Sequence, residues 1–80
     1  MPVVFRHGSL RFFFYSDEGT PREPPHIHVR QTGREAKLWL RLGLSEAYNY
    51  GFNERELRRS RELIEANRAQ IETAWNEFFS

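Results

Sequence analysis

The sequence contains no cysteine, which excludes disulfide frameworks, thiolate zinc sites, iron–sulfur clusters and thiol enzymes. It also has no run of about 18 apolar residues, so we expect no transmembrane helix. The first residues, from Met1 to Arg6, lack the long apolar segment of a secretory signal peptide. These absences predict a cytoplasmic protein. With 80 residues, we expect one domain over residues 1–80, because two would each be too small to hold a core.

Lysine is nearly absent, since the basic residues are eleven arginines and Lys37. Arginine is the better residue for flat, bidentate contacts with carboxylate or phosphate groups. The net charge is only +1, so the molecule is not a polycation. Residues 1–50 nevertheless carry seven basic and five acidic residues, whereas residues 51–80 carry five and six. The positive surplus therefore lies in the first half of the chain.

The first half of the chain has the residue pattern of β-strands. Ser9–Tyr15 is rich in aromatic residues, His26–Arg30 alternates strictly, and Glu35–Leu42 alternates again after a tight turn at Gln31–Arg34. The segment Gly43–Gly51 predicts either a short fourth strand or an irregular crossing. Alternation gives the strands one apolar face, which carries Leu10, Phe12, Phe14, Ile27, Val29, Ala36, Leu38, Leu40 and Leu42.

The second half of the chain predicts one long helix. Asn53 and Glu56 form the pattern of a capping box, and Phe52 and Leu57 are spaced for a hydrophobic staple. Apolar residues then repeat every seven positions at Leu57, Ile64, Ile71 and Phe78. No glycine or proline interrupts residues 53–79, so we expect a helix of about 26 residues.

These elements predict an α+β domain with a small antiparallel sheet of three to four strands over about residues 8–50. The long C-terminal helix, about residues 53–79, covers one face of the sheet. We expect Leu57, Ile64 and Ile71 to be buried against the apolar face of the strands.

Two histidines at alternate positions, His26 and His28, are the sharpest chemical feature of the sequence. Because Ile27 and Val29 point to the core, His26, His28 and Arg30 share the opposite face of the strand, which we expect to be open to solvent. Loss of an exposed histidine should then change stability by less than about 1 kcal/mol. That face suits a phosphodiester, since arginine and lysine bind phosphate, aromatic rings stack on bases and imidazole moves protons. The residues predicted to bind on this face are Arg11, Tyr15, Lys37, Trp39 and Arg41. His26, His28 and Arg30 are the candidate catalytic residues of a metal-independent ribonuclease.

Two other interpretations of the histidines stay open. His26 and His28 can share a metal ion in a metal-dependent hydrolase if a third ligand is present, from His7, Asp17, Glu18 or Glu23. Two certain ligands are a weak signal, so we expect no metal and no other cofactor. Alternatively, the histidines are ordinary strand residues, and the face binds protein or nucleic acid without chemistry.

Several segments together resemble one prokaryotic family, catalogued as domain of unknown function 4160. The segments that carry the resemblance are Gly8–Ser16, Glu23–Val29, Ala36–Leu40, Gly51–Phe52, Glu56–Leu57 and Trp75–Phe79. Members are often encoded beside a small protein of the family catalogued as domain of unknown function 2442. The pair is commonly interpreted as a type II toxin–antitoxin module in which this domain is the toxin.

The resemblance implies a toxin component that acts on RNA or on translation, with an antitoxin-like small protein as its partner. It carries no agreed catalytic mechanism. Separately, a chain of this size with twelve aromatic residues is expected to leave an apolar patch or an open strand edge. We therefore expect either a homodimer or a complex with the antitoxin-like neighbour, and no membrane association.

Overall fold

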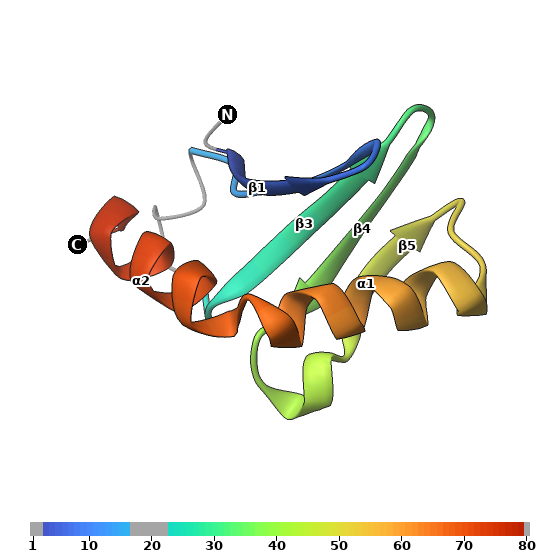
Figure 1. The fold of residues 1–80 in the computed structure, drawn as a ribbon. Coiled ribbons are helices and arrows are strands. Elements are labelled where there is room, and N and C mark those ends of the chain that lie inside the picture. Colours follow the sequence, from blue (N-terminus) through green and yellow to red (C-terminus); the bar gives the residue numbers. More distant parts are fainter. Residues whose placement is uncertain (1–2, 17–22, 80) are drawn as a thin grey trace.

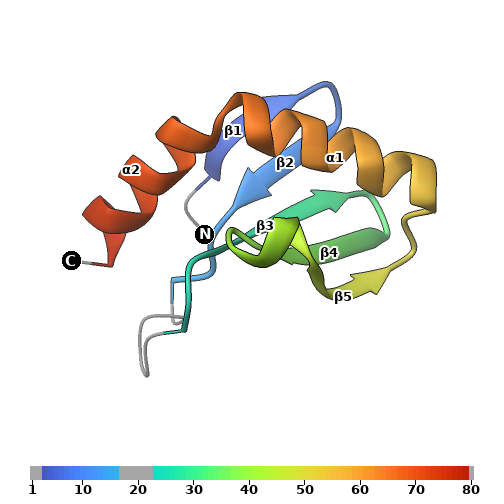
Figure 2. The same ribbon diagram turned by 90° about the horizontal axis from the view of Figure 1, so that it is seen from below.

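The computed structural model describes residues 3–16 and 23–79, and in them the chain forms five strands followed by two helices (Figure 1). The sheet is an antiparallel meander in which the strands follow one another in chain order. Both helices lie on one face of the sheet (Figures 1 and 2). The elements are β1 (Val3–His7), β2 (Leu10–Phe13), β3 (His26–Gln31), β4 (Arg34–Trp39), the 3-10 turn η1 (Leu42–Leu44), β5 (Glu46–Tyr50), α1 (Glu54–Ala66) and α2 (Arg68–Phe78).

The α+β class is confirmed, but the sheet has five strands instead of three to four. β1 was not predicted from the sequence, because it is a half-exposed edge strand in which only Val4 and Phe5 are partly buried. Such a strand has little apolar alternation. The ambiguous segment after β4 forms η1 and then β5, which pairs with β4 across an irregularity at Lys37 and Leu38.

The single long helix predicted from the sequence is wrong, because the helix breaks at Asn67. The side-chain amide of Asn67 donates to the Leu63 carbonyl at 2.8 Å, the same oxygen to which the Asn67 backbone amide donates at 3.1 Å. Asparagine competes for backbone hydrogen bonds in this way and is a poor residue for a helix interior. The chain changes direction there, as Figure 1 shows.

The start of α1 is confirmed in detail. The Asn53 side chain accepts from the Glu56 amide at 2.8 Å, and the Glu56 carboxylate accepts from the Asn53 amide at 2.9 Å. Arg34 of β4 adds an ion pair to Glu56 at 2.5 Å and lies 5.0 Å from the centre of the Phe52 ring. Gly51 has φ +107, and a Cβ atom there would lie 2.7 Å from the Arg34 side chain, which explains the glycine.

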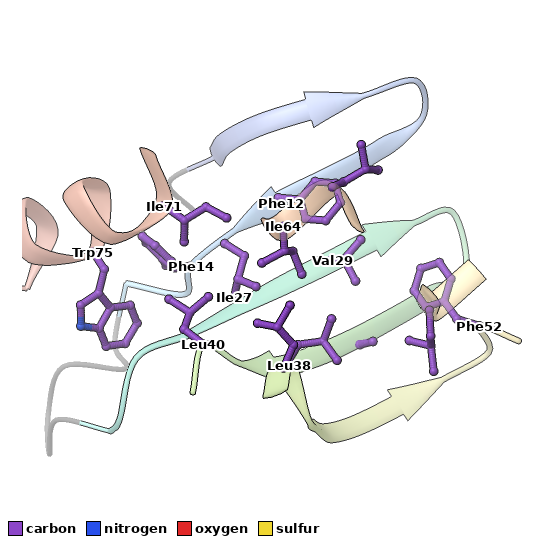
Figure 3. Packing of buried hydrophobic residues seen from close by; sticks show 14 of the residues in the cluster. Phe12, Phe14, Ile27, Val29, Leu38, Leu40, Phe52, Ile64, Ile71 and Trp75 are labelled. Carbon is purple, nitrogen blue, oxygen red and sulfur yellow. The ribbon is translucent and has the colours of Figure 1, made fainter. Parts of the chain in front are cut away.

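The core lies between the helices and one face of the sheet, as predicted (Figure 3). Leu57, Ile64 and Ile71 are fully buried, and Leu10 lies partly buried at the margin of the cluster. The remaining predicted strand residues whose burial is described are fully or almost fully buried, namely Phe12, Phe14, Ile27, Val29, Ala36, Leu38 and Leu40. Within the described ranges, neither helix is long and apolar enough to cross a bilayer.

Candidate functional site

The strand register gathers the predicted site residues on the sheet face opposite the helices, which we call the far face. His28 lies between Phe13 of β2 and Lys37 of β4, and His26 lies opposite Trp39. Arg30 lies between Arg11 and Glu35 in the next row of the far face. The prediction that these side chains share one face is confirmed, because their neighbours Phe12, Ile27, Val29, Ala36 and Leu38 form the core on the other side.

The expectation that the two histidines are open to solvent is wrong. His26 is 0% exposed and His28 is 1% exposed. Aromatic rings surround them. The His28 ring stacks on Phe13 with centroids 5.3 Å apart and meets the edge of Tyr15 at 4.6 Å, whereas His26 lies 4.9 Å from Trp75 of α2. This cover is not predictable from the sequence, because Trp75 belongs to α2, which follows the break at Asn67 and is distant along the chain.

His28 belongs to a polar network on the far face that ends on Glu35. The Tyr48 hydroxyl donates to one carboxylate oxygen of Glu35 at 2.6 Å, and the Tyr15 hydroxyl donates to the other at 2.8 Å. Because the Tyr48 proton is used in this way, His28 Nδ1, at 3.1 Å, is the donor to the Tyr48 oxygen. The carboxylate thus fixes both tyrosines, and Tyr48 fixes one tautomer of His28.

His26 is fixed by the chain that precedes it. Its Nδ1 atom lies 2.9 Å from the carbonyl oxygen of Pro24. A carbonyl can only accept, so Nδ1 carries a proton here too. The His26 ring also meets His28 and Trp39 edge to face, with centroids 5.1 and 5.7 Å away. Each imidazole is therefore held in one orientation by packing and a hydrogen bond, which is the arrangement of structural histidines.

The basic residues of the far face differ in what they contact. Lys37 pairs with Glu23 at 2.5 Å and lies 4.8 Å from the centre of the Trp39 ring, so its charge is already matched. Arg30 is exposed and Arg11 is half-buried. Arg41 is exposed beside a hollow of about 420 Å³ that Pro24, Pro25 and Trp39 also line. Arg30 and Arg11 are thus the predicted residues best placed to meet an anionic ligand on the sheet.

Two network residues, Glu35 and Tyr48, were missed in the sequence analysis. Tyr48 lies on β5, which the sequence left ambiguous. Glu35 has a detectable signal, because it follows a tight turn and must then lie opposite Arg30 in a hairpin. The sequence does not show that its partners are two tyrosines from different strands.

The third ligand of the metal interpretation is not found in residues 3–16 and 23–79, where no three His, Cys, Asp or Glu side chains are grouped for a metal ion. Glu23 contacts Lys37. His7 pairs with Leu10 at the end of the sheet opposite to His26. Asp17 and Glu18 lie outside the described residues.

Comparison with known proteins identifies one family. No curated protein and no solved structure matches the chain. The family whose sequence model matches is described as a domain of unknown function, DUF4160, and the match covers residues 9–76. It includes β2–β5, both helices to Asn76, and every residue of the His28 network. The chain therefore belongs to the DUF4160 family.

Proposed function

We propose that this protein is the toxin component of a type II toxin–antitoxin module, and that it acts on RNA or translation by binding RNA on the far face. The role of toxin is supported by the family, through the interpretation of its gene pairs. The observation that carries RNA binding is the pairing of Arg11 directly opposite Arg30. Neither has a carboxylate partner in the part of the chain that the structure describes. Arginine without such a partner is well suited to phosphate.

The burial of the histidines favours binding over cleavage. A general acid or base must come within about 2.6–3.2 Å of the atom that gains or loses the proton. His26 and His28 lie beneath aromatic rings, and the described structure leaves an RNA strand no route to them. We propose that they hold the far face in shape while the arginines bind the ligand.

Expression in a bacterium under an inducible promoter tests this proposal. We expect wild type to arrest growth and the double variant Arg11→Gln/Arg30→Gln to lose that effect. The matched control is Arg55→Gln/Arg58→Gln, which removes the same charge from exposed positions of α1 and should still arrest growth. Soluble protein is measured in each culture. A toxic double variant at equal soluble amount would contradict the proposal.

His26→Ala and His28→Ala separate binding from catalysis. If the histidines are structural, growth arrest should fall only as far as the amount of folded protein falls. If either is catalytic, the folded fraction should be inactive, because a positioned acid or base contributes about 10²–10⁴-fold. Purified wild type should bind RNA and leave it intact. RNA cleavage that is lost with EDTA and regained with added ion would favour the metal-dependent hydrolase.

The partner is proposed to be an antitoxin-like small protein of the kind catalogued as domain of unknown function 2442, with a homodimer as the other form. Both outer strands, β1 and β5, are open edges of the sheet. Exposed apolar side chains lie near them at Val3, Tyr50 and Phe78. Light scattering that shows only monomer, together with no binding to the neighbouring gene product, would contradict this part of the proposal.

A further inference from the structure

Three arginines stand side by side across three strands of the sheet. Arg6 of β1 lies opposite Arg11 of β2, and Arg11 lies opposite Arg30 of β3. Each arginine has a neighbour along its strand that packs with the core, namely Phe5, Phe12 and Val29. The rings of Phe5 and Phe12 stack with their centroids 4.3 Å apart. Since side chains alternate along a strand, all three arginines project from the far face. We call Arg6, Arg11 and Arg30 the arginine row.

The arginine row is unfavourable for folding. Like charges directly opposite each other on neighbouring strands destabilise a sheet, and Arg11 faces one on each side. No carboxylate pairs with any of the three within residues 3–16 and 23–79. The next residue of the same row is Glu35, but both of its oxygens accept from tyrosine hydroxyls. Among the described residues the row thus places three guanidinium groups, none of them in an ion pair, beside the single carboxylate of Glu35, and this surplus of positive charge is suited to an anion.

The far end of the same row carries an aromatic side chain. Tyr50 of β5 lies opposite Glu35 and is 68% exposed, the most exposed large apolar residue in the described ranges. Its ring lies 5.1 Å from that of Tyr48, with an angle of 32° between the planes. Basic residues and an exposed ring on one surface suit single-stranded nucleic acid, because phosphates meet the cations and a base stacks on the ring. Here Glu35 lies between the last arginine, Arg30, and the ring of Tyr50.

We propose that the arginine row binds successive phosphates of a single-stranded RNA that crosses the strands from β1 toward β5, with a base stacked on Tyr50. The inference rests on the proposed RNA-binding function. It adds that the RNA is single-stranded, that it crosses the sheet from β1 toward β5, and that Arg6 takes part in binding. Neighbouring strands lie about 4.8 Å apart, so the row presents one guanidinium per strand along a straight track. Each guanidinium can grip a phosphate with two parallel hydrogen bonds. A helical RNA duplex presents its bases in a stack and offers none to Tyr50.

Equilibrium binding of fluorescent single-stranded polyuridine at several salt concentrations tests the arginine row. Each phosphate contact contributes about 0.7 to the slope of log affinity against log salt for single strands. Arg6→Gln, Arg11→Gln and Arg30→Gln should each lower the slope by about 0.7 and weaken binding about fivefold at 0.1 M salt. Arg58→Gln, at an exposed position of α1 on the other side of the sheet, should leave the slope unchanged. Tyr50→Ala should weaken binding about fivefold or more with the slope kept.

Stability separates the arginine row from a structural role. Arg11→Gln should raise the unfolding midpoint, because it removes a charge that faces Arg6 and Arg30. A structural arginine would give the opposite shift. If wild type binds polyuridine and Arg6→Gln keeps the affinity and salt slope of Arg58→Gln, the proposed binding by the arginine row is wrong, but the proposed RNA-binding function stands. If wild type binds no RNA, the proposed function fails as well. Binding of polyglutamate that is lost in the Gln variants of the arginine row would then indicate that the row binds an acidic protein.

Discussion

The two faces of the sheet are both buried near the middle, but by different means. The helix-covered face is apolar, and side chains such as Phe12, Ile27 and Leu38 are completely buried in the core cluster (Figure 3). No helix of the described residues lies over the far face (Figure 2), yet His28 is 1% exposed. The rings of Phe13 and Tyr15 cover it, and its Nδ1 atom donates to the Tyr48 hydroxyl, which in turn donates to Glu35. Burial on the far face therefore depends on matched hydrogen bonds as well as on packing.

The largest expected effect is on the helix-covered face. Phe12→Ala should lower the free energy of unfolding by about 3–5 kcal/mol, because the residue is fully enclosed and its removal leaves a cavity. Denaturant unfolding followed by tryptophan fluorescence measures the change. Arg58→Gln on the solvent side of α1 should change it by less than about 0.5 kcal/mol. A loss for Phe12→Ala as small as that of the control would show that the core is packed differently.

His28→Ala sharpens the comparison on the far face. An exposed histidine would contribute less than about 1 kcal/mol, as we expected from the sequence. A buried imidazole stacked on Phe13 and bonded to Tyr48 should contribute about 2–4 kcal/mol. The same unfolding measurement decides between these values. A cost near that of an exposed residue would mean that the ring is open to solvent.

Two hydroxyl deletions, one on each side of the sheet, test the role of hydrogen bonds. Tyr48→Phe removes a group that joins His28 to Glu35, so it should cost about 1–3 kcal/mol. Ser60→Ala removes a buried hydroxyl of α1 that has no hydrogen-bond partner within the described residues, so stability should stay the same or rise. Equal losses from the two substitutions would contradict the idea that the far face depends on its polar network.

A smaller effect is expected in acid at the junction of β4 and α1. The backbone amide of Asn53 and the Arg34 side chain hold the pKa of the Glu56 carboxyl below its usual value of 4.5. A lowered pKa in the folded state means that the charged carboxylate stabilises the fold above pH 4.5 and that this stabilisation is lost as the pH falls below it. Unfolding of wild type and Glu56→Gln from pH 7 to 3 should therefore converge in acid. Parallel curves would exclude this contribution.

Local sequence signals predicted the helix-covered face well. Strand alternation and the seven-residue repeat place Phe12, Ile27 and Ile64 correctly because each pattern follows from backbone geometry alone. The capping box at Asn53 is equally local. The break at Asn67 was missed because seven-residue periodicity continues through it, from Ile64 to Ile71.

The far face was only partly predictable, since strand alternation shows on which face of the sheet a side chain lies but not which residues cover it. It placed His26 and His28 opposite the core correctly. Their burial depends on Trp75 and Tyr48, which reach them from α2 and β5. The arginine row was missed because it requires β1 and the register of three strands, neither of which the sequence shows.

The most direct test of the central claim, that the far face binds RNA, is to follow arginine side-chain Nε–H signals by NMR during addition of single-stranded polyuridine. We expect the signals of Arg6, Arg11 and Arg30 to shift together and saturate at one RNA concentration, whereas those of Arg55 and Arg58 on α1 stay in place. Shifts confined to the α1 arginines, or no shifts at any polyuridine concentration, would contradict RNA binding on the far face.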